Sequence, residues 1–397
     1  IYMSEELKKL KNRIDYFCRN KVNAFSPTIS PAPKSVERNE IESIDKAIRY
    51  FHRHGVGEIV VQRKYMGSYC DIYLQKRLED TYFVSRNGHT IDHINLQSAV
   101  EACRDLHKRF DWSKLSVVII QSELMPWSAL GKGLIENELA GYLNVHRNHC
   151  DYLSQSNLYE KIVRVKESPA YREYAEDKKR LSGKEMKNKY PHHIVRQYES
   201  LAAFRILDLN VYKESVAIYR RQIDHFGKQG DIYFKPFNIL KKIFDDGSEA
   251  LVNDNLSYQT VNDDAFLHLP IDDEETLNNS IQTVYEWFST LEKKMEEGIV
   301  IKPREAFIKG LPPAFKVRNN QYLTMIYGVD FHEQYSYDLH KRNIGHKLEF
   351  SVNVWMLNRQ ILDVKYKDIH TENYLLKNLV FDRIMGERVE ATLDMRL

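Results

Sequence analysis

The sequence contains few cysteines and no long hydrophobic run. Its four cysteines are far apart and form no Cys-x-x-Cys pair: Cys18, Cys70, Cys103 and Cys150. This spacing argues against a disulfide framework or a structural zinc site and is typical of unpaired thiols in a reducing cytoplasm. No apolar stretch approaches the roughly 20 residues that a membrane helix needs, and the N-terminus has no signal-peptide pattern. We therefore expect a cytoplasmic protein without a membrane span.

The chain also lacks a strong net charge. Its 397 residues are 43% hydrophobic and 29% charged, with a formal net charge of +2, so the whole-chain charge gives no signal for nucleic acid. Any basic surface must be local. Residues 161–189 contain ten Lys or Arg and five Asp or Glu. This stretch is either a solvated helix face or a surface that contacts a phosphate backbone.

Hydrophobic spacing predicts helical modules at both ends of the chain. Apolar residues at helical spacing predict helices over 4–20 and 36–54, which we group as an N-terminal helical module, residues 1–55. The same spacing predicts a C-terminal helical module over residues 331–397.

The region between these modules, residues 56–330, combines short strands with helices. Strands are predicted over 58–63, 70–75, 81–85, 115–121, 204–209, 231–234 and 299–301. Helices are predicted over 96–110 and 275–296, with a helical insertion over about 129–200. Short strands with polar breaks favour antiparallel sheets, so the expected fold class is α+β.

A lysine at the end of a strand is the first candidate for chemistry. Lys64 follows the β-branched Val60 and Val61 and precedes a loose turn at Gly67 and Ser68. An amine can lose its proton and attack an electrophile, whereas a guanidinium cannot. Lys-x-x-Gly alone is a weak motif, because a solvated strand-end lysine gives the same pattern.

Three later segments carry charges that suit the same reaction. They contain Glu123, after the run 115–121; Glu297 and Lys302, in Glu-Gly-Ile-Val-Ile-Lys; and Lys316 and Arg318, at alternate positions. Residues two apart on a strand point to the same side, so short strands of a twisted sheet can direct these side chains into one groove. Cations there would neutralise charge developing on a phosphate, and glutamates would supply oxygen ligands for Mg²⁺.

In this order the motifs resemble those of the covalent nucleotidyltransferase superfamily of ligases and capping enzymes. Longer strings are similar to the ligase domain of the bacterial polynucleotide kinase-phosphatase (Pnkp) family, from about residue 58 to the last residue. These strings are Lys64-Tyr-Met-Gly-Ser68, Glu123-Leu-Met-Pro-Trp-Ser128, Glu297-Gly-Ile-Val-Ile-Lys-Pro303, Pro313-Ala-Phe-Lys-Val-Arg318, Gln321-Tyr-Leu-Thr-Met-Ile-Tyr-Gly328 and Asp394-Met-Arg-Leu397. The resemblance implies a DNA/RNA ligase-like nucleotidyltransferase core of antiparallel sheets, unrelated to the ATP-grasp fold.

The resemblance also implies an activity and its partners. Members of this family are ATP-dependent RNA ligases: a lysine is adenylylated, AMP passes to an RNA 5′-phosphate, and a 3′-hydroxyl seals the ends. The implied cofactors are ATP and Mg²⁺ or Mn²⁺. The implied partners are RNA with 5′-phosphate and 3′-hydroxyl ends, upstream kinase and phosphatase domains of the same polypeptide, and a 3′-terminal RNA 2′-O-methyltransferase. Domains upstream would fit a chain that begins with Ile1 rather than methionine.

Residue by residue, the resemblance implies a nucleotide site around Lys64 as the nucleophile. Glu123 and Glu297 would bind the metal, and Glu123 could also hold the ribose. The residues that the resemblance assigns to ATP or AMP, besides these two glutamates, are Gln62, Arg63, Gly67, Ser68, Arg86, Phe204, Lys302, Lys316 and Arg318.

Three of these positions have a distinct implied role, and a further position, residue 69, departs from the family. Gln62 would read the adenine edge, Arg86 would contact the sugar or phosphate, and Phe204 would stack on adenine. Tyr69 stands where the family tends to have arginine, so the contact expected there is open.

Other interpretations remain open from the sequence. A DNA ligase or a GTP-dependent capping-type enzyme would carry the same motifs, and an RNA-binding scaffold could retain them after losing activity. Phe204 could be an ordinary core residue, and Lys316 with Arg318 could protect a strand edge. His146-x-x-His149 has no partner cluster, so we assign it no metal.

Overall fold

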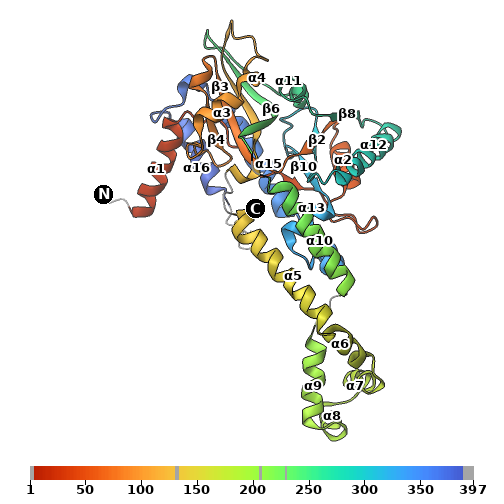
Figure 1. The fold of residues 1–397 in the computed structure, drawn as a ribbon. Coiled ribbons are helices and arrows are strands. Elements are labelled where there is room, and N and C mark those ends of the chain that lie inside the picture. The colour runs from red at the N-terminus through yellow and green to blue at the C-terminus, as the bar shows by residue number, and fades with distance from the viewer. Residues whose placement is uncertain (1–3, 130–133, 205–207, 229, 388–397) are drawn as a thin grey trace.

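The centre of the molecule consists of two five-stranded sheets with helices packed against them (Figure 1). The computed structural model describes residues 4–129, 134–204, 208–228 and 230–387. The mixed α+β class predicted from the sequence is confirmed. Among the described residues, no helix is long and apolar enough to cross a membrane.

The first sheet joins strands that are far apart in the sequence. Its order is β1 (Ser30–Pro31), β10 (Phe315–Arg318), β9 (Gly298–Pro303), β2 (Glu58–Lys64) and β8 (Phe266–Pro270). Neighbours are antiparallel except β1 and β10. Side chains alternate across each strand, so Ile59 and Val61 pack against α2 (Ile44–Arg53) and α12 (Glu274–Lys293). The side chains at the intervening positions of the strand point the other way, toward the second sheet.

The second sheet is antiparallel throughout. Its order is β4 (Tyr82–Ser85), β3 (Ser68–Gln75), β5 (Leu115–Met125), β6 (Tyr233–Phe244) and β7 (Glu249–Leu251). One face packs against α3 (Leu96–Ala102) and α4 (Arg104–His107). The other face contributes Tyr73, Ile119 and Leu240 to a core shared with α1 (Glu5–Arg19), α15 (Gly345–Asp363) and α16 (Tyr374–Met385).

The helical insertion projects away from both sheets. Its root is the pair α5 (Ala140–Gln155) and α10 (Leu209–Phe226), which packs against α13 (Asn320–Tyr327). Residues 158–203 form a helical arm beyond this root (Figure 1). The arm contains α6 (Leu158–Glu167), α7 (Pro169–Arg180), α8 (Gly183–Lys189) and α9 (His192–Ala203). The remaining α-helices among the described residues are α11 (Tyr258–Val261) and α14 (Phe331–Lys341).

The two N-terminal helices do not form a module of their own. The helix α1 begins after its N-cap Ser4 and packs against α16, whereas α2 packs against α12 on the other sheet. The predicted helix 36–54 begins only at Ile44, because Ser35 and Glu40 pair in a turn and Ser43 caps the helix. The N-terminal residues are therefore shared between the two cores.

Three other sequence expectations are corrected or extended. The predicted helix 96–110 is divided into α3 and α4 at Cys103. The predicted strand 204–209 is wrong where the structure describes it, because Phe204 ends α9 and Asp208 caps α10; residues 205–207 lie outside the described residues. The short strand expected at 231–234 becomes the long β6. The motif at 394–397 also lies outside the described residues.

Candidate active site

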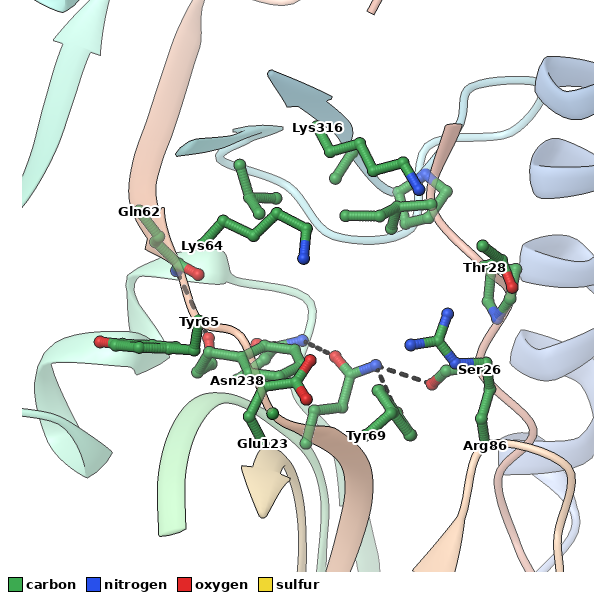
Figure 2. A pocket seen from close by; sticks show the side chains of 18 of the residues that line it. Ser26, Thr28, Gln62, Lys64, Tyr65, Tyr69, Arg86, Glu123, Asn238 and Lys316 are labelled. Carbon is green, nitrogen blue, oxygen red and sulfur yellow. Dashed lines mark hydrogen bonds between the residues drawn. The ribbon is translucent and has the colours of Figure 1, made fainter. Parts of the chain in front are cut away.

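A cavity of about 580 Å³ lies between the two sheets, and strand ends from both contribute to its wall. Its lining includes most of the residues expected from the motifs: Gln62, Arg63, Lys64, Gly67, Ser68, Arg86, Glu123, Glu297, Lys302 and Lys316. In Figure 2 the side chains of Lys64, Lys316 and Arg86 point into the space between the sheets. Only Phe204 and Arg318 of the predicted set are absent from the lining.

The register of the first sheet explains why three lysines converge. Lys64 of β2 lies opposite Gly298 of β9, and Val60 lies opposite Lys302. Lys316 of β10 lies opposite Val300, two residues from Lys302. Because side chains alternate, Lys64, Lys302 and Lys316 emerge on the same face, away from the apolar core of this sheet.

Gly298 allows β9 and β10 to approach closely beside Lys64. Its φ is +154°, and a Cβ built there would lie 2.0 Å from the backbone oxygen of Val317. A larger residue would push the two strands apart, so the glycine of Glu-Gly-x-Val-x-Lys has a steric role.

The amine of Lys64 contacts a buried carboxylate. Its Nζ lies 2.6 Å from Oε1 of Glu297, and the two side chains are 19% and 2% exposed. Glu123 lines the same cavity from the second sheet. Burial raises the pKa of Glu123 to about 7, while the charges of Lys64 and Arg86 oppose this shift.

The two other lysines have their amines in a poorly solvated part of the cavity wall. Burial lowers the pKa of Lys302 to about 7. Burial, with the charges of Arg318 and Lys64, holds the pKa of Lys316 well below its ordinary value. A bound anion would favour the charged form of both amines. This part of the cavity wall therefore suits a phosphate ligand.

Phe237 is an aromatic site residue that the sequence analysis missed. It lines the cavity from β6, its ring lies 4.7 Å from Nζ of Lys302, and its backbone oxygen accepts a hydrogen bond from Nε2 of Gln62 at 3.3 Å. Only the first residues of β6 were predicted as a strand, so the alternation of side chains along it did not mark Phe237 as a site residue. Other lining residues that were missed are Gln121, Trp127, Asn238, Tyr322 and Trp355.

Phe204 does not reach this cavity. It lies at the end of α9 in the helical arm, 47% exposed, and is absent from the lining. The resemblance to the family assigned Phe204 to stacking on adenine, and a separate prediction placed it in a strand; in the structure Phe204 is the C-cap of α9.

Arg318 and Arg63 have partners elsewhere. Arg318 shares the face of Lys316 but binds Glu42, with Nη2 2.5 Å from Oε1, and Arg342 binds the same carboxylate at 2.8 Å. Although burial opposes it, the two guanidinium groups hold the pKa of Glu42 below its ordinary value. Arg63 alternates away from Lys64 and binds Glu296 at 2.8 Å at the edge of the cavity.

The donor atoms present would fit a hard cation such as Mg²⁺. Glu123 and Glu297 both line the cavity, and each has one buried carboxylate oxygen, Oε2, without a hydrogen-bond partner. Carboxylate oxygens are the ligands that Mg²⁺ prefers. In the described part of the chain, no group of three or more His, Cys, Asp or Glu could hold a metal by itself. His146 and His149 instead both contact the hydroxyl of Tyr212.

Comparison with known proteins gives the family. Residues 19–372 match the family described as "PNKP adenylyltransferase domain, ligase domain". The chain belongs to the PNKP ligase-domain family. The resemblance expected from the motifs is thereby confirmed, and the match spans both sheets and the helical arm of this PNKP ligase domain.

Two solved structures contain close relatives of this PNKP ligase domain. A chain of the "Structure of the Pnkp1/Rnl/Hen1 RNA repair complex" is 53% identical, with a TM-score of 0.91 and full coverage (100%) of both chains. A chain of the "Structure of Pnkp1/Rnl/Hen1 complex" is 52% identical, with the same TM-score and coverage. An "Archaeal ATP-dependent RNA ligase - form 1" is 12% identical with a TM-score of 0.35, covering 91% of this chain and 67% of that chain. No curated protein matches the sequence.

Proposed function

We propose that this PNKP ligase domain is an ATP-dependent RNA ligase module that forms a covalent bond between Lys64 and AMP. The observation that supports this most directly is the placement of the Lys64 amine. It contacts the buried Glu297 at 2.6 Å in a cavity whose wall also holds Lys302 and Lys316. The family name, adenylyltransferase, agrees with this chemistry.

In the first step Lys64 would attack the α-phosphorus of ATP. Its amine must first lose a proton, and the contacting Glu297 carboxylate can accept it. The new bond joins Nζ to phosphorus, and the bond to pyrophosphate breaks. Lys302 and Lys316 would neutralise the charge that develops on the phosphate oxygens.

The next two steps would transfer AMP and join the RNA ends. An oxygen of an RNA 5′-phosphate attacks the lysine-bound phosphorus, which frees Lys64 and places AMP on the RNA. A 3′-hydroxyl then attacks that 5′-phosphate, a phosphodiester forms, and AMP leaves. Lys64 is thereby restored for another cycle.

We propose that Phe237, rather than Phe204, contacts the adenine. Phe237 lies in the cavity beside Lys302 and Gln62, whereas Phe204 lies on the arm. A base between an aromatic face and the Gln62 side chain would place its phosphates toward the lysines. Arg63 and Arg318 would support neighbouring backbone rather than touch the nucleotide, because acids already pair with both.

Glu123 and Glu297 would hold the Mg²⁺ or Mn²⁺ of the reaction. Their unpartnered Oε2 atoms provide the donors. When bound, the cation would neutralise phosphate charge next to the cationic wall.

We propose that the chain works in an RNA repair assembly. Its relatives at 52% and 53% identity come from structures named as Pnkp1/Rnl/Hen1 complexes. By analogy, kinase and phosphatase domains would prepare the 5′-phosphate and 3′-hydroxyl ends, and an RNA 2′-O-methyltransferase would modify the repaired 3′ terminus.

Labelling with ATP tests the proposal. Incubation with ATP labelled at the α-phosphate and Mg²⁺ should give a covalent protein adduct that withstands denaturation and alkali but is hydrolysed in acid, as a phosphoramidate is, and Lys64→Ala should abolish it. Labelling from GTP instead, or sealing of nicked DNA in preference to RNA, would favour the capping or DNA-ligase alternative. Tight RNA binding without any adduct would favour a scaffold.

A further inference from the structure

Arg86 carries a charge that no acid pairs with in the described part of the chain. It makes no hydrogen bond or ion pair with described residues; its guanidinium carbon lies 4.8 Å from the centre of the Tyr69 ring. A guanidinium stacked on an aromatic face keeps its N–H groups free for another ligand. The side chain also lines the cavity, so these donors are directed to where a ligand would bind.

Strand register places Tyr69 between Arg86 and the catalytic acids. Cys70 of β3 pairs with Ser85 of β4, so the next residues, Tyr69 and Arg86, are neighbours at the ends of the two strands. On its other side Tyr69 pairs with Glu123 of β5. Arg86, Tyr69 and Glu123 therefore form a row across the end of the second sheet.

The Tyr69 ring is itself fixed by a chain of hydrogen bonds. Its hydroxyl donates to Oδ1 of Asp71 at 2.7 Å and accepts from Nε2 of Gln121 at 2.9 Å. The Gln121 side chain also donates to Ser26 at 2.7 Å and accepts from Asn238 at 3.0 Å (Figure 2). Strands β3, β5 and β6 and the segment at Ser26 thus hold one aromatic ring in place.

The backbone that carries Arg86 is also constrained. The turn after β4 closes with a hydrogen bond from the Ser85 N–H to the His89 oxygen at 2.7 Å. Gly88 has a φ of +83°, and a Cβ there would lie 2.2 Å from the Phe25 ring. With the turn and the ring both held, the guanidinium has little freedom left.

We propose that Tyr69 is a positioning residue that holds Arg86 as a phosphate contact of this site. The inference rests on the proposed function, since it deepens the role of the same cavity. The Tyr69 ring brings no charge of its own to the cavity and orients the neighbouring cation. The ligand is a phosphate, supplied either by ATP or by the 5′ end of RNA.

A double-mutant cycle tests this assignment. Tyr69→Leu removes the aromatic face, Tyr69→Phe keeps it, and Arg86→Ala removes the cation; the exposed Tyr374→Leu is the matched control. Two affinities are measured: ATP against adenosine, and 5′-phosphorylated against 5′-hydroxyl RNA. Unfolding temperatures and the KM and kcat of adenylylation are measured in parallel.

We expect Tyr69→Leu to weaken binding of one phosphorylated ligand about tenfold, with little change for its unphosphorylated counterpart. Arg86→Ala should weaken it at least as much, and the double variant should be no worse than Arg86→Ala alone. Tyr69→Phe should recover most of the loss. Which of the two ligands responds identifies the source of the phosphate.

The inference is overturned if the two single effects multiply in the double variant, or if Tyr69→Leu lowers only the unfolding temperature. Both binding measurements are made without Mg²⁺, so that Lys64 does not react with ATP. If wild-type protein forms no Lys64 adduct while Tyr69 and Arg86 remain coupled in phosphate binding, the proposed function fails and this inference stands.

Discussion

At the scale of single residues, the cavity is defined by lysine amines that are shielded from water. A buried amine without a counter-ion loses part of its proton affinity, and a bound phosphate restores it. Lys302 and Lys316 show this loss because the same strands that direct them into the cavity also shield them. We therefore expect the site to bind protons when its anionic ligand binds.

We expect ATP binding without Mg²⁺ to take up protons at about pH 8. The pKa of Lys302 in the free protein is about 7, so above that pH its amine is mostly neutral and must gain a proton to pair with phosphate. Affinity should accordingly fall as pH rises above neutrality. Glu123, whose pKa is also about 7, would add to this uptake, because a bound phosphate disfavours its ionised form. Calorimetry in buffers of different ionisation enthalpy measures the uptake.

The control for this experiment is Lys302→Arg. A guanidinium stays protonated throughout this pH range, so the variant should take up fewer protons than the wild type. Proton release on ATP binding, or equal uptake by both proteins, would contradict the role given to Lys302.

We expect Phe237→Leu to raise the KM for ATP in adenylylation by about tenfold, because a stacked aromatic contact of about 1–3 kcal/mol is lost. Phe204→Leu is the matched control, since the same change on the arm should leave that KM unaltered. The reverse pattern would restore the assignment made from the sequence.

At the scale of elements, two strands that approach each other at Gly298 align the cationic wall. The Cβ of any other residue would meet the Val317 backbone oxygen, next to Lys316 and Arg318. Separation of β9 and β10 would move Lys316 relative to Lys64. A larger residue at this one position would therefore disturb the arrangement of the reacting groups.

We expect Gly298→Ala to lower the free energy of unfolding by more than about 2 kcal/mol and to reduce adenylylation. Gly183→Ala is the control, because nothing lies within 4 Å of a Cβ at that position; its effect should stay within about 0.5 kcal/mol. Denaturant unfolding measures both. A Gly298→Ala protein as stable as the wild type would show that the strands can adjust.

The convergence of Lys64, Lys302 and Lys316 could be predicted from the sequence because strand alternation is a local rule. The exceptions depend on contacts that the sequence does not show. Arg318 lies on the same strand face as Lys316, but its guanidinium forms an ion pair with Glu42, which belongs to a distant segment of the chain. Phe204 lies in a segment whose apolar residues predict a strand, but in the structure Phe204 caps α9 and Asp208 caps α10.

At the scale of the whole molecule, the helical arm extends away from the two sheets (Figure 1). Several of its cations already pair: Lys178 with Glu199, and Lys189 with Glu173 and Asp177. Others make no ion pair among the described residues and remain available to a polyanion. The basic stretch noted in the sequence therefore contains both structural and free charges.

If the free charges hold RNA, replacing three of them should reduce the salt dependence of RNA binding. The variant Lys161→Ala/Lys184→Ala/Lys187→Ala should lower the slope of log affinity against log salt by about 2 for single-stranded RNA. Adenylylation should be unchanged. The charge-matched control is Lys8→Ala/Lys11→Ala/Lys114→Ala. An equal slope in both variants would assign the arm's cations to a solvated surface.

The most direct test is to locate the AMP on the protein. After incubation with ATP and Mg²⁺, protease digestion and mass spectrometry should find one AMP, attached to the peptide that contains Lys64 and bonded to that side chain. AMP on Lys302 or Lys316, or no AMP on any lysine of an otherwise folded protein, would contradict the account.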